Sequence, residues 1–171
     1  VDVIHGHLMA KWQGEGKSEA ECKKLWQAYV PAHLLPRLHG FELMMAPYAM
    51  AHMLLAIKLA ETGYKHDEGS PRAQIFLTNS LSEPFDAASQ LGFMGEALAV
   101  EGEGANHVKM DVPITVIIGN PPYSVSSQNM GSWIRALMEP YKQGLNEKKI
   151  NFDDDYLKFI RFAERLVSRT K

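Results

Sequence analysis

The chain has 171 residues, of which 46% are hydrophobic and 22% charged, so it is long enough to bury the core of one globular domain. Its formal net charge of −2 excludes a strongly basic, nucleic-acid-coating surface, although a local basic groove stays open. The single Cys22 excludes an internal disulfide and favours a reducing cytoplasm. The longest apolar run, 43–59, is interrupted by Pro47 and Lys58 and is too broken for a membrane span.

Two helices are expected in residues 1–36, which form a helical lead-in. The first covers 1–12, where apolar side chains recur at helical spacing. Ser18 and Glu21 then form a Ser-x-x-Glu capping box, which predicts the start of the second helix. We expect that helix to run to about Tyr29, because Pro31 and Pro36 lack the N–H that a helix interior needs.

Two strands with a helix between them are expected next. The strands are 37–42, which ends in Glu42, and 73–78, which is followed by Asn79. The intervening helix is predicted over 47–61, because its first residue is a proline and a glycine follows its end closely.

Residues 80–112 are expected to form a polar connection, with an amphipathic segment around 91–100 and a loose Glu-Gly-Glu-Gly stretch at 101–104. Ile114-Thr-Val-Ile-Ile118 follows and has the best strand pattern in the chain, β-branched and apolar on both faces like a buried central strand. After it come Asn120-Pro-Pro-Tyr123, a serine-rich loop, a helix near 133–138 and a final helix from about Asp155.

Alternation of strands and helices predicts an α/β domain with a mostly parallel sheet. In such sheets, ligands bind at the carboxyl ends of the strands. The residues expected at those ends are Glu42, Asn79 and Asn120. All three side chains form hydrogen bonds, and we therefore interpret them as candidate site residues.

Asn120-Pro-Pro-Tyr123 suits the chemistry of an attacking amino group. An aromatic or amide nitrogen is a poor nucleophile because its lone pair is delocalised. An asparagine oxygen and a backbone carbonyl can each accept one N–H and leave the lone pair free to attack. Pro121 and Pro122 stiffen the turn, and Tyr123 offers a flat face on which a base can stack. Taken alone, the tetrapeptide also fits a proline turn that ends a strand.

The tetrapeptide resembles the catalytic motif of N6-adenine methyltransferases, and also that of release-factor glutamine methyltransferases. Longer stretches favour the first family, because they resemble the methyltransferase region of bacterial single-polypeptide restriction–modification enzymes. These stretches are 39–52, 77–81, 117–124 and 154–163. Such enzymes join a nuclease, a helicase-like translocase, an adenine methyltransferase and a target-recognition domain. The resemblance covers about three-quarters of the chain.

The resemblance implies a partial Rossmann-like fold of the S-adenosylmethionine-dependent methyltransferases, without its first strand and its glycine-rich cofactor loop. The helical lead-in would then be followed by a cofactor side at 37–112. The catalytic motif and its following helices would occupy 113–171. A chain that lacks the cofactor loop is expected to bind the cofactor weakly by itself.

The resemblance also implies residue roles. Catalytic roles fall on Asn120, Pro121, Pro122 and Tyr123. S-adenosyl-L-methionine would be bound by Glu42, Leu43, Asn79 and Asn120. The target would be contacted by Tyr123, Ser124 and Ser126. The implied partners are double-stranded DNA with a flipped adenine and the remainder of a larger polypeptide that carries a target-recognition domain; no membrane partner is implied. Whether nuclease and translocase domains are attached stays open.

Several alternatives stay open at the level of sequence. The chemistry also fits methylation of a protein glutamine, and a non-catalytic scaffold of the same fold is the alternative from a different class. The polar residues after the motif fit either a contact with the target nucleotide or its phosphate, or a solvated loop: Ser124, Ser126, Ser127, Gln128 and Asn129. Asp153-Asp-Asp155 is interpreted as an acidic helix start, and no metal is expected.

Overall fold

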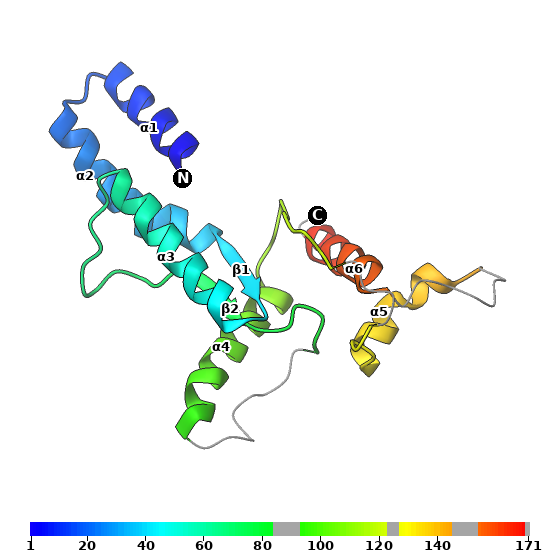
Figure 1. Ribbon diagram of the computed structural model, residues 1–171. Coiled ribbons are helices and arrows are strands. Elements are labelled where there is room, and N and C mark those ends of the chain that lie inside the picture. The colour runs from blue at the N-terminus through cyan, green and yellow to red at the C-terminus, as the bar shows by residue number, and fades with distance from the viewer. Residues whose placement is uncertain (84–92, 123–126, 145–153, 170–171) are drawn as a thin grey trace. The chain divides into compact units, whose positions relative to one another are not determined.

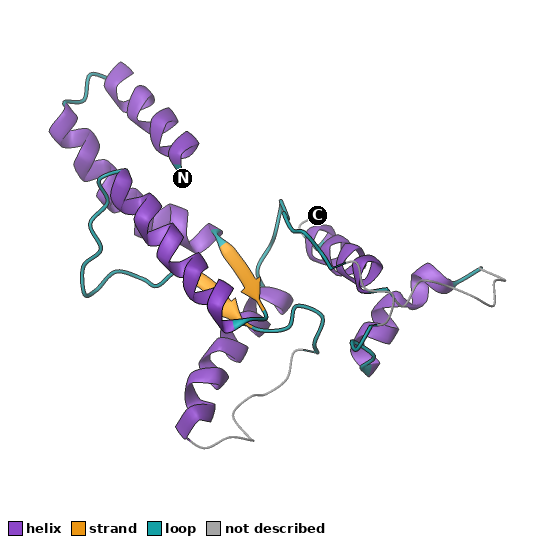
Figure 2. Cartoon of the chain, viewed as in Figure 1, coloured by secondary structure: helices purple, strands orange, loops and turns teal. Residues whose placement is uncertain are grey.

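The computed structural model describes residues 1–83, 93–122, 127–144 and 154–169. The chain divides into two compact units, Val1–Phe76 and Leu77–Lys171. Helices predominate, and the described residues contain one two-stranded sheet, as Figures 1 and 2 show. The division falls inside residues 37–112, which the resemblance groups as the cofactor side.

The first unit begins with two helices, α1 (Asp2–Gly14) and α2 (Glu19–Tyr29). The predicted capping box is confirmed. The Ser18 hydroxyl accepts the Glu21 N–H at 3.3 Å, and the Glu21 carboxylate accepts the Ser18 N–H at 2.8 Å. These reciprocal bonds satisfy two of the backbone donors that a helix start leaves without a partner.

The predicted end of the second helix at about Tyr29 is confirmed, although the chain keeps a helical path beyond Pro31. A π-helical turn, η1 (Val30–Leu34), follows α2 directly, and a 3-10 turn, η2 (Leu35–Arg37), follows it. Pro31 lies at the start of η1, where its missing N–H is not required, and the Val30 carbonyl accepts the Leu35 N–H instead. Burial of Val30 and Leu35 favours the continued turn over an open loop.

A strand, a helix and a second strand follow in the chain. They are β1 (His39–Glu42), α3 (Met45–Glu61) and β2 (Gln74–Leu77), with the two strands parallel. The predicted order of elements is confirmed, with shorter strands and a helix that begins two residues before Pro47. Gly63 follows the end of α3 with φ of 81°, a left-handed conformation that glycine adopts without strain.

The core of the first unit lies between α2, η1 and the end of α3. Its buried members are Trp26, Val30, Leu34, Leu35, Leu59 and Tyr64. The indole N–H of Trp26 donates to the Thr62 hydroxyl at 3.0 Å, and the Gln27 side chain donates to the Gly63 carbonyl at 2.7 Å. These bonds fix α2 against the end of α3 and leave the buried indole satisfied.

The second unit contains α4 (Phe93–Met110), α5 (Ser132–Lys142) and α6 (Asp155–Ser168). The Glu-Gly-Glu-Gly stretch at 101–104 lies inside α4, so its interpretation as a loose connection is wrong. Each helical glycine costs about 1 kcal/mol relative to alanine. Tertiary contacts offset this cost, because Ala105 and Val108 are buried and the Glu101 carboxylate accepts the Leu77 N–H at 2.9 Å.

The strand predicted at 114–118 does not form. The segment is irregular, and Val116 and Ile118 are 74% and 95% exposed. An apolar extended segment becomes a strand only when a neighbouring strand takes up its N–H and C=O groups. In the part of the chain that the structure describes, the sheet consists of β1 and β2 alone and supplies no such neighbour.

Candidate functional site

Glu42 closes β1 and turns its carboxylate toward the start of α3. Its Oε1 accepts the N–H groups of Leu43 at 2.9 Å and of Met44 at 3.0 Å. A carboxylate is favoured there because a helix start carries partial positive charge. Within the described ranges no donor is bonded to the second oxygen, Oε2, so it can accept a hydrogen bond from a ligand. Leu43 is 67% exposed at this strand end.

Asn79 lies two residues after β2 and uses both ends of its side chain. The amide Nδ2 donates to Asn129 Oδ1 at 2.7 Å, and Oδ1 accepts the Leu81 N–H at 2.9 Å. The Asn79 carbonyl also accepts a hydrogen bond from Lys109 Nζ at 2.8 Å. The side chain thereby links the segment after β2 to the segment that follows the Asn120 motif.

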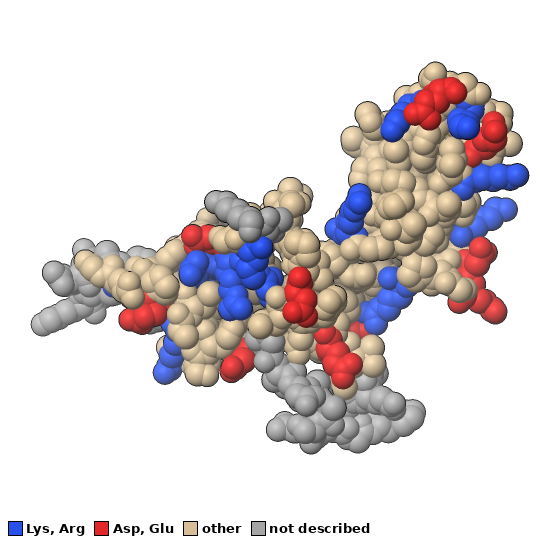
Figure 3. All heavy atoms as spheres, turned by 180° about the vertical axis from the view of Figure 1, so that it is seen from behind, with Lys and Arg blue, Asp and Glu red and all other residues tan. Residues whose placement is uncertain are grey.

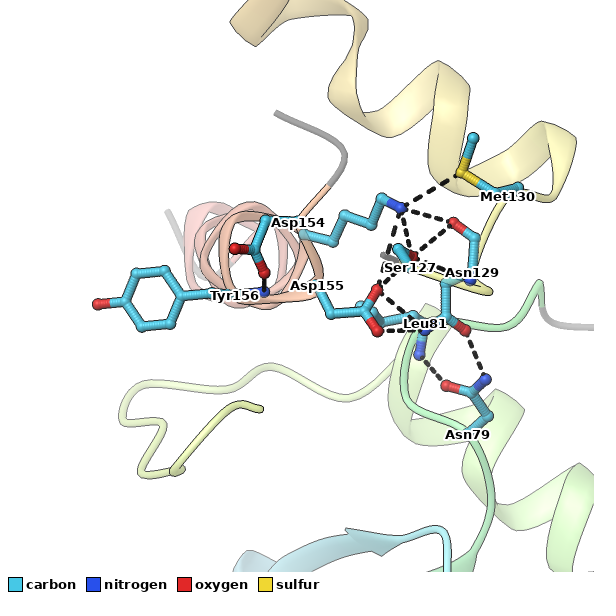
Figure 4. A network of polar contacts seen from close by, with 9 residues as sticks. Asn79, Leu81, Ser127, Asn129, Met130, Asp154, Asp155 and Tyr156 are labelled. Carbon is cyan, nitrogen blue, oxygen red and sulfur yellow. Dashed lines mark hydrogen bonds and ion pairs between the residues drawn. The ribbon is translucent and has the colours of Figure 1, made fainter. Parts of the chain in front are cut away.

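A partly buried polar network continues from Asn129 to the first turn of α6 (Figure 4). Asp155 Oδ1 accepts the Ser127 hydroxyl at 2.5 Å, and both carboxylate oxygens lie 3.1 Å from Asn129 Nδ2. Lys158 Nζ donates to Ser127 Oγ at 2.6 Å and to the Asn129 carbonyl at 2.8 Å. It also lies 3.7 Å from Met130 Sδ.

The two charges of this network are removed from water together. Lys158 is 2% exposed and Asp155 is 9% exposed, and Lys158 Nζ lies 3.9 Å from Asp155 Oδ1. Burial of a single charge would cost several kcal/mol, whereas a pair that also satisfies its hydrogen bonds is tolerated. The network is therefore a mutually dependent set, and loss of one charged member leaves the other without compensation.

The sequence interpretation assigned the acidic run before α6 to helix capping, and Asp154 fulfils that role. Its side chain accepts the Tyr156 N–H at 3.0 Å as the N-cap of α6. Asp155 and Lys158 were not recognised as network members. Their three-residue separation, which places both on one face of a helix, was the available signal.

A second buried lysine lies at the end of α4. Lys109 is 2% exposed, and its ammonium group donates to the Asn79 carbonyl and, at 3.3 Å, to the Ser82 carbonyl. Burial lowers the pKa of Lys109 to about 8, because the interior disfavours the charged form. This lysine holds the turn that follows β2 against α4.

The proposed catalytic residues lie apart from these bonds. Asn120 and Pro122 are exposed and Pro121 is half-buried, in the irregular segment after 114–118. Tyr123, Ser124 and Ser126 lie outside the described residues. None of the described residues bonds to the Asn120 side chain, so its amide oxygen can accept a hydrogen bond from a ligand.

Two further properties concern the described ranges alone. They contain no cluster of three or more His, Cys, Asp or Glu side chains placed to hold a metal ion. None of their helices is both long enough and apolar enough to cross a membrane.

Among known proteins, the chain is similar in fold to a protein of known structure. No family model matches the sequence, and no curated protein matches it. A matching solved structure is the ATP-dependent Type ISP restriction–modification enzyme LlaBIII bound to DNA, at 21% identity and a TM-score of 0.60. The match covers 96% of this chain and 11% of the enzyme's chain. The two share a fold over that region. This chain thus spans about a tenth of the length of the enzyme that it matches.

Proposed function

We propose that this chain is a region of a DNA-modifying restriction–modification enzyme and takes part in transfer of a methyl group to N6 of adenine. The observation that carries the proposal is Asn120. Its side chain is exposed, unbonded among the described residues and followed by two prolines. The shared fold with a restriction–modification enzyme supports the proposal over nearly the whole chain.

In the proposed reaction Asn120 positions the amine. Its side-chain oxygen accepts one N–H of the exocyclic amino group, and a carbonyl of the following proline turn accepts the other. The nitrogen then becomes pyramidal and its lone pair is free to attack. Pro121 and Pro122 restrict the turn, so the acceptors are held in place before the target arrives. Catalysis by these residues consists of positioning and electrostatics rather than covalent chemistry.

Glu42 fits a role in binding S-adenosylmethionine. One carboxylate oxygen is held by the Leu43 and Met44 N–H groups, and the other is available to accept a ribose hydroxyl. When bound, S-adenosylmethionine supplies the methyl group: its carbon–sulfur bond breaks with the electron pair left on sulfur, a carbon–nitrogen bond forms, and the amine loses a proton. Asn79 fits less simply, since both of its polar atoms are already bonded.

The fold proposed for the complete domain is a larger, Rossmann-like parallel sheet. Val116, Ile117 and Ile118 have the composition of a buried strand, yet all three side chains are exposed. We propose that polypeptide outside these 171 residues supplies a strand that pairs with this segment. The Asn120 motif would then follow the carboxyl end of a sheet strand, where ligands bind in such folds.

Double-stranded DNA is the proposed substrate, and the enzyme of similar fold is itself bound to DNA. Figure 3 shows Lys and Arg side chains gathered on the visible face of the second unit. On α6, Arg161 is paired with Glu164 at 2.8 Å. Arg165, one turn further on, has no carboxylate partner among the described residues and can face a phosphate. The adenine must leave the base stack before its amino group is accessible.

The test uses the full-length protein that contains these residues, incubated with plasmid DNA and methyl-labelled S-adenosylmethionine. Nucleosides from the digested DNA should carry the label as N6-methyladenine, and an Asn120→Ala variant should leave the DNA unlabelled. Label in cytosine, or in a glutamine of a translation release factor added to the same reaction, would contradict the proposed substrate. Absence of label from every acceptor would favour a non-catalytic scaffold.

A further inference from the structure

We propose that Asp155 and Lys158 of α6 are positioning residues for the methyl transfer, because they hold the segment that follows the Asn120 motif. The inference rests on the proposed function and adds residues that lie outside its motif. The segment held is 127–130, which begins seven positions after Asn120.

The network joins three parts of the second unit that are far apart in the sequence (Figure 4). Asn79 comes from the segment after β2, Ser127 and Asn129 follow the motif, and Asp155 begins α6. Asn79 and Asn129 are 50 positions apart, and Ser127 and Asp155 are 28 positions apart. A segment bonded on both sides in this way is held in place relative to the end of β2 and to α6.

The bonding of the network favours a positioning role over ligand binding. An ammonium group has three N–H donors. Those of Lys158 face Ser127 Oγ, the Asn129 carbonyl and Met130 Sδ. The Asp155 carboxylate is likewise engaged by Ser127 and Asn129. Because the donors and acceptors are used within the protein and the charged groups are buried, a phosphate or a nucleotide has little to bind here.

The consequence for catalysis follows from the accuracy that positioning requires. A reacting group must be held within about 0.5 Å of its productive place, and a displacement of about 1 Å can cost about 100-fold in rate. The prolines restrict the chain directly after Asn120. The network restricts the segment further along, so that the backbone after the motif is held at 127–130 as well.

The test compares neighbouring acidic residues of the full-length enzyme. Asp155→Asn removes the charge that compensates Lys158, whereas Asp154→Ala removes only the N-cap of the same helix. We expect Asp155→Asn to lower kcat about 10- to 100-fold and to leave the Kd for S-adenosylmethionine within about twofold. Asp154→Ala should destabilise α6 and keep kcat within about twofold of the wild type.

A less disruptive substitution tests the inference in case Asp155→Asn does not fold. Ser127→Ala removes one hydroxyl, leaves both charges in place and should lower kcat in the same direction as Asp155→Asn, with KM for DNA changed less than kcat. A kcat equal to that of the wild type in Ser127→Ala and in folded Asp155→Asn would overturn the inference. So would an equal loss in Asp154→Ala, because helix stability alone would then explain the effect.

Hydrogen exchange gives a readout that does not depend on methyl transfer. The Asn129 N–H is bonded to Ser127 Oγ at 3.0 Å, so amides of 127–130 should exchange faster in Asp155→Asn than in Asp154→Ala. Equal exchange in the two variants would overturn the inference and leave the proposed function intact. Faster exchange in an enzyme that labels no adenine would instead show that the proposed function fails while the anchoring is real.

Discussion

The side-chain amide of Asn79 donates a hydrogen bond to the side-chain oxygen of Asn129 at 2.7 Å, across 50 positions of sequence. The resemblance to methyltransferases implies that Asn79 contacts the cofactor. In the structure the side chain also connects the segment after β2 to the segment after the Asn120 motif. The two roles lead to different results when Asn79 is replaced.

A double-mutant cycle measures the Asn79–Asn129 bond. Asn79→Ala and Asn129→Ala should each destabilise the chain, and their coupling should be about 0.5–1.5 kcal/mol, the usual net value of one hydrogen bond. Urea unfolding of the four proteins gives this coupling. Asn79→Ala paired with Gln27→Ala, from the first unit, is the control and should be additive. Additive energies for Asn79 and Asn129 would show that their contact contributes nothing.

Asn120→Ala should abolish methyl transfer in the full-length protein, because we propose that its side chain holds the amine. S-adenosylmethionine binding should stay nearly unchanged, because Glu42 and the other cofactor contacts that the resemblance implies remain in place. Labelled-cofactor assays and calorimetry measure the two quantities. Tyr123→Ala should weaken target binding by about 1–3 kcal/mol, the usual contribution of base stacking on an aromatic ring, and Tyr123→Phe should be mild. Full activity of Asn120→Ala would defeat the assignment.

Because Lys109 is buried, we expect the free energy of unfolding to increase with pH. Burial lowers the pKa of Lys109 in the folded chain to about 8, from an ordinary value of 10.5. Between these values the unfolded chain binds a proton that the folded chain does not, so the free energy of unfolding increases as pH rises through that window. Urea unfolding at pH 7.5 and 9.5 measures this increase in the free energy of unfolding. The control variant Lys23→Met, which replaces an exposed lysine, should keep the full increase. Lys109→Met should show a smaller one. Identical increases in the two variants would rule out Lys109 as its source.

Trp26→Ala should destabilise the first unit by about 3–5 kcal/mol, the usual cost of deleting a buried large aromatic side chain. Trp26 is 1% exposed and lies in the centre of the unit's core. Thr62→Val keeps the shape and removes the hydroxyl that accepts the indole N–H and donates to the Leu59 carbonyl, so it should cost less, about 1–3 kcal/mol. Equal losses in thermal or urea unfolding would mean that the hydrogen bond, not packing, dominates.

Ile118→Lys should affect the stability of the 171-residue chain and of the full-length protein differently. Ile118 is 95% exposed here, so the substitution should change the unfolding free energy of the 171-residue chain by no more than about 0.5 kcal/mol. In the full-length protein the same change should be strongly destabilising, because the segment is proposed to become a buried strand. A neutral effect in both proteins would argue against the larger parallel sheet.

Local patterns were sufficient wherever the stabilising partners are close in sequence. The capping box at Ser18 and Glu21 and the acidic start of α6 were predictable because each bonds within three residues. The β1–α3–β2 order followed in the same way from proline, glycine and hydrophobic spacing. Local patterns failed at 101–104, where burial against distant residues outweighs the propensity of glycine to end a helix.

The sequence by itself determined the candidate chemistry, because Asn120 and the two prolines after it are adjacent along the chain and their meaning does not depend on distant contacts. Only the tertiary structure decided that Asn79, Ser127, Asn129, Asp155 and Lys158 form one network around a buried ion pair. It also decided that Val116, Ile117 and Ile118 are exposed and lie outside the sheet formed by β1 and β2. The physical reason is the same in both cases. Compensation of a buried charge and pairing of a strand both require partners that are distant in sequence, and local spacing does not reveal whether the fold supplies them.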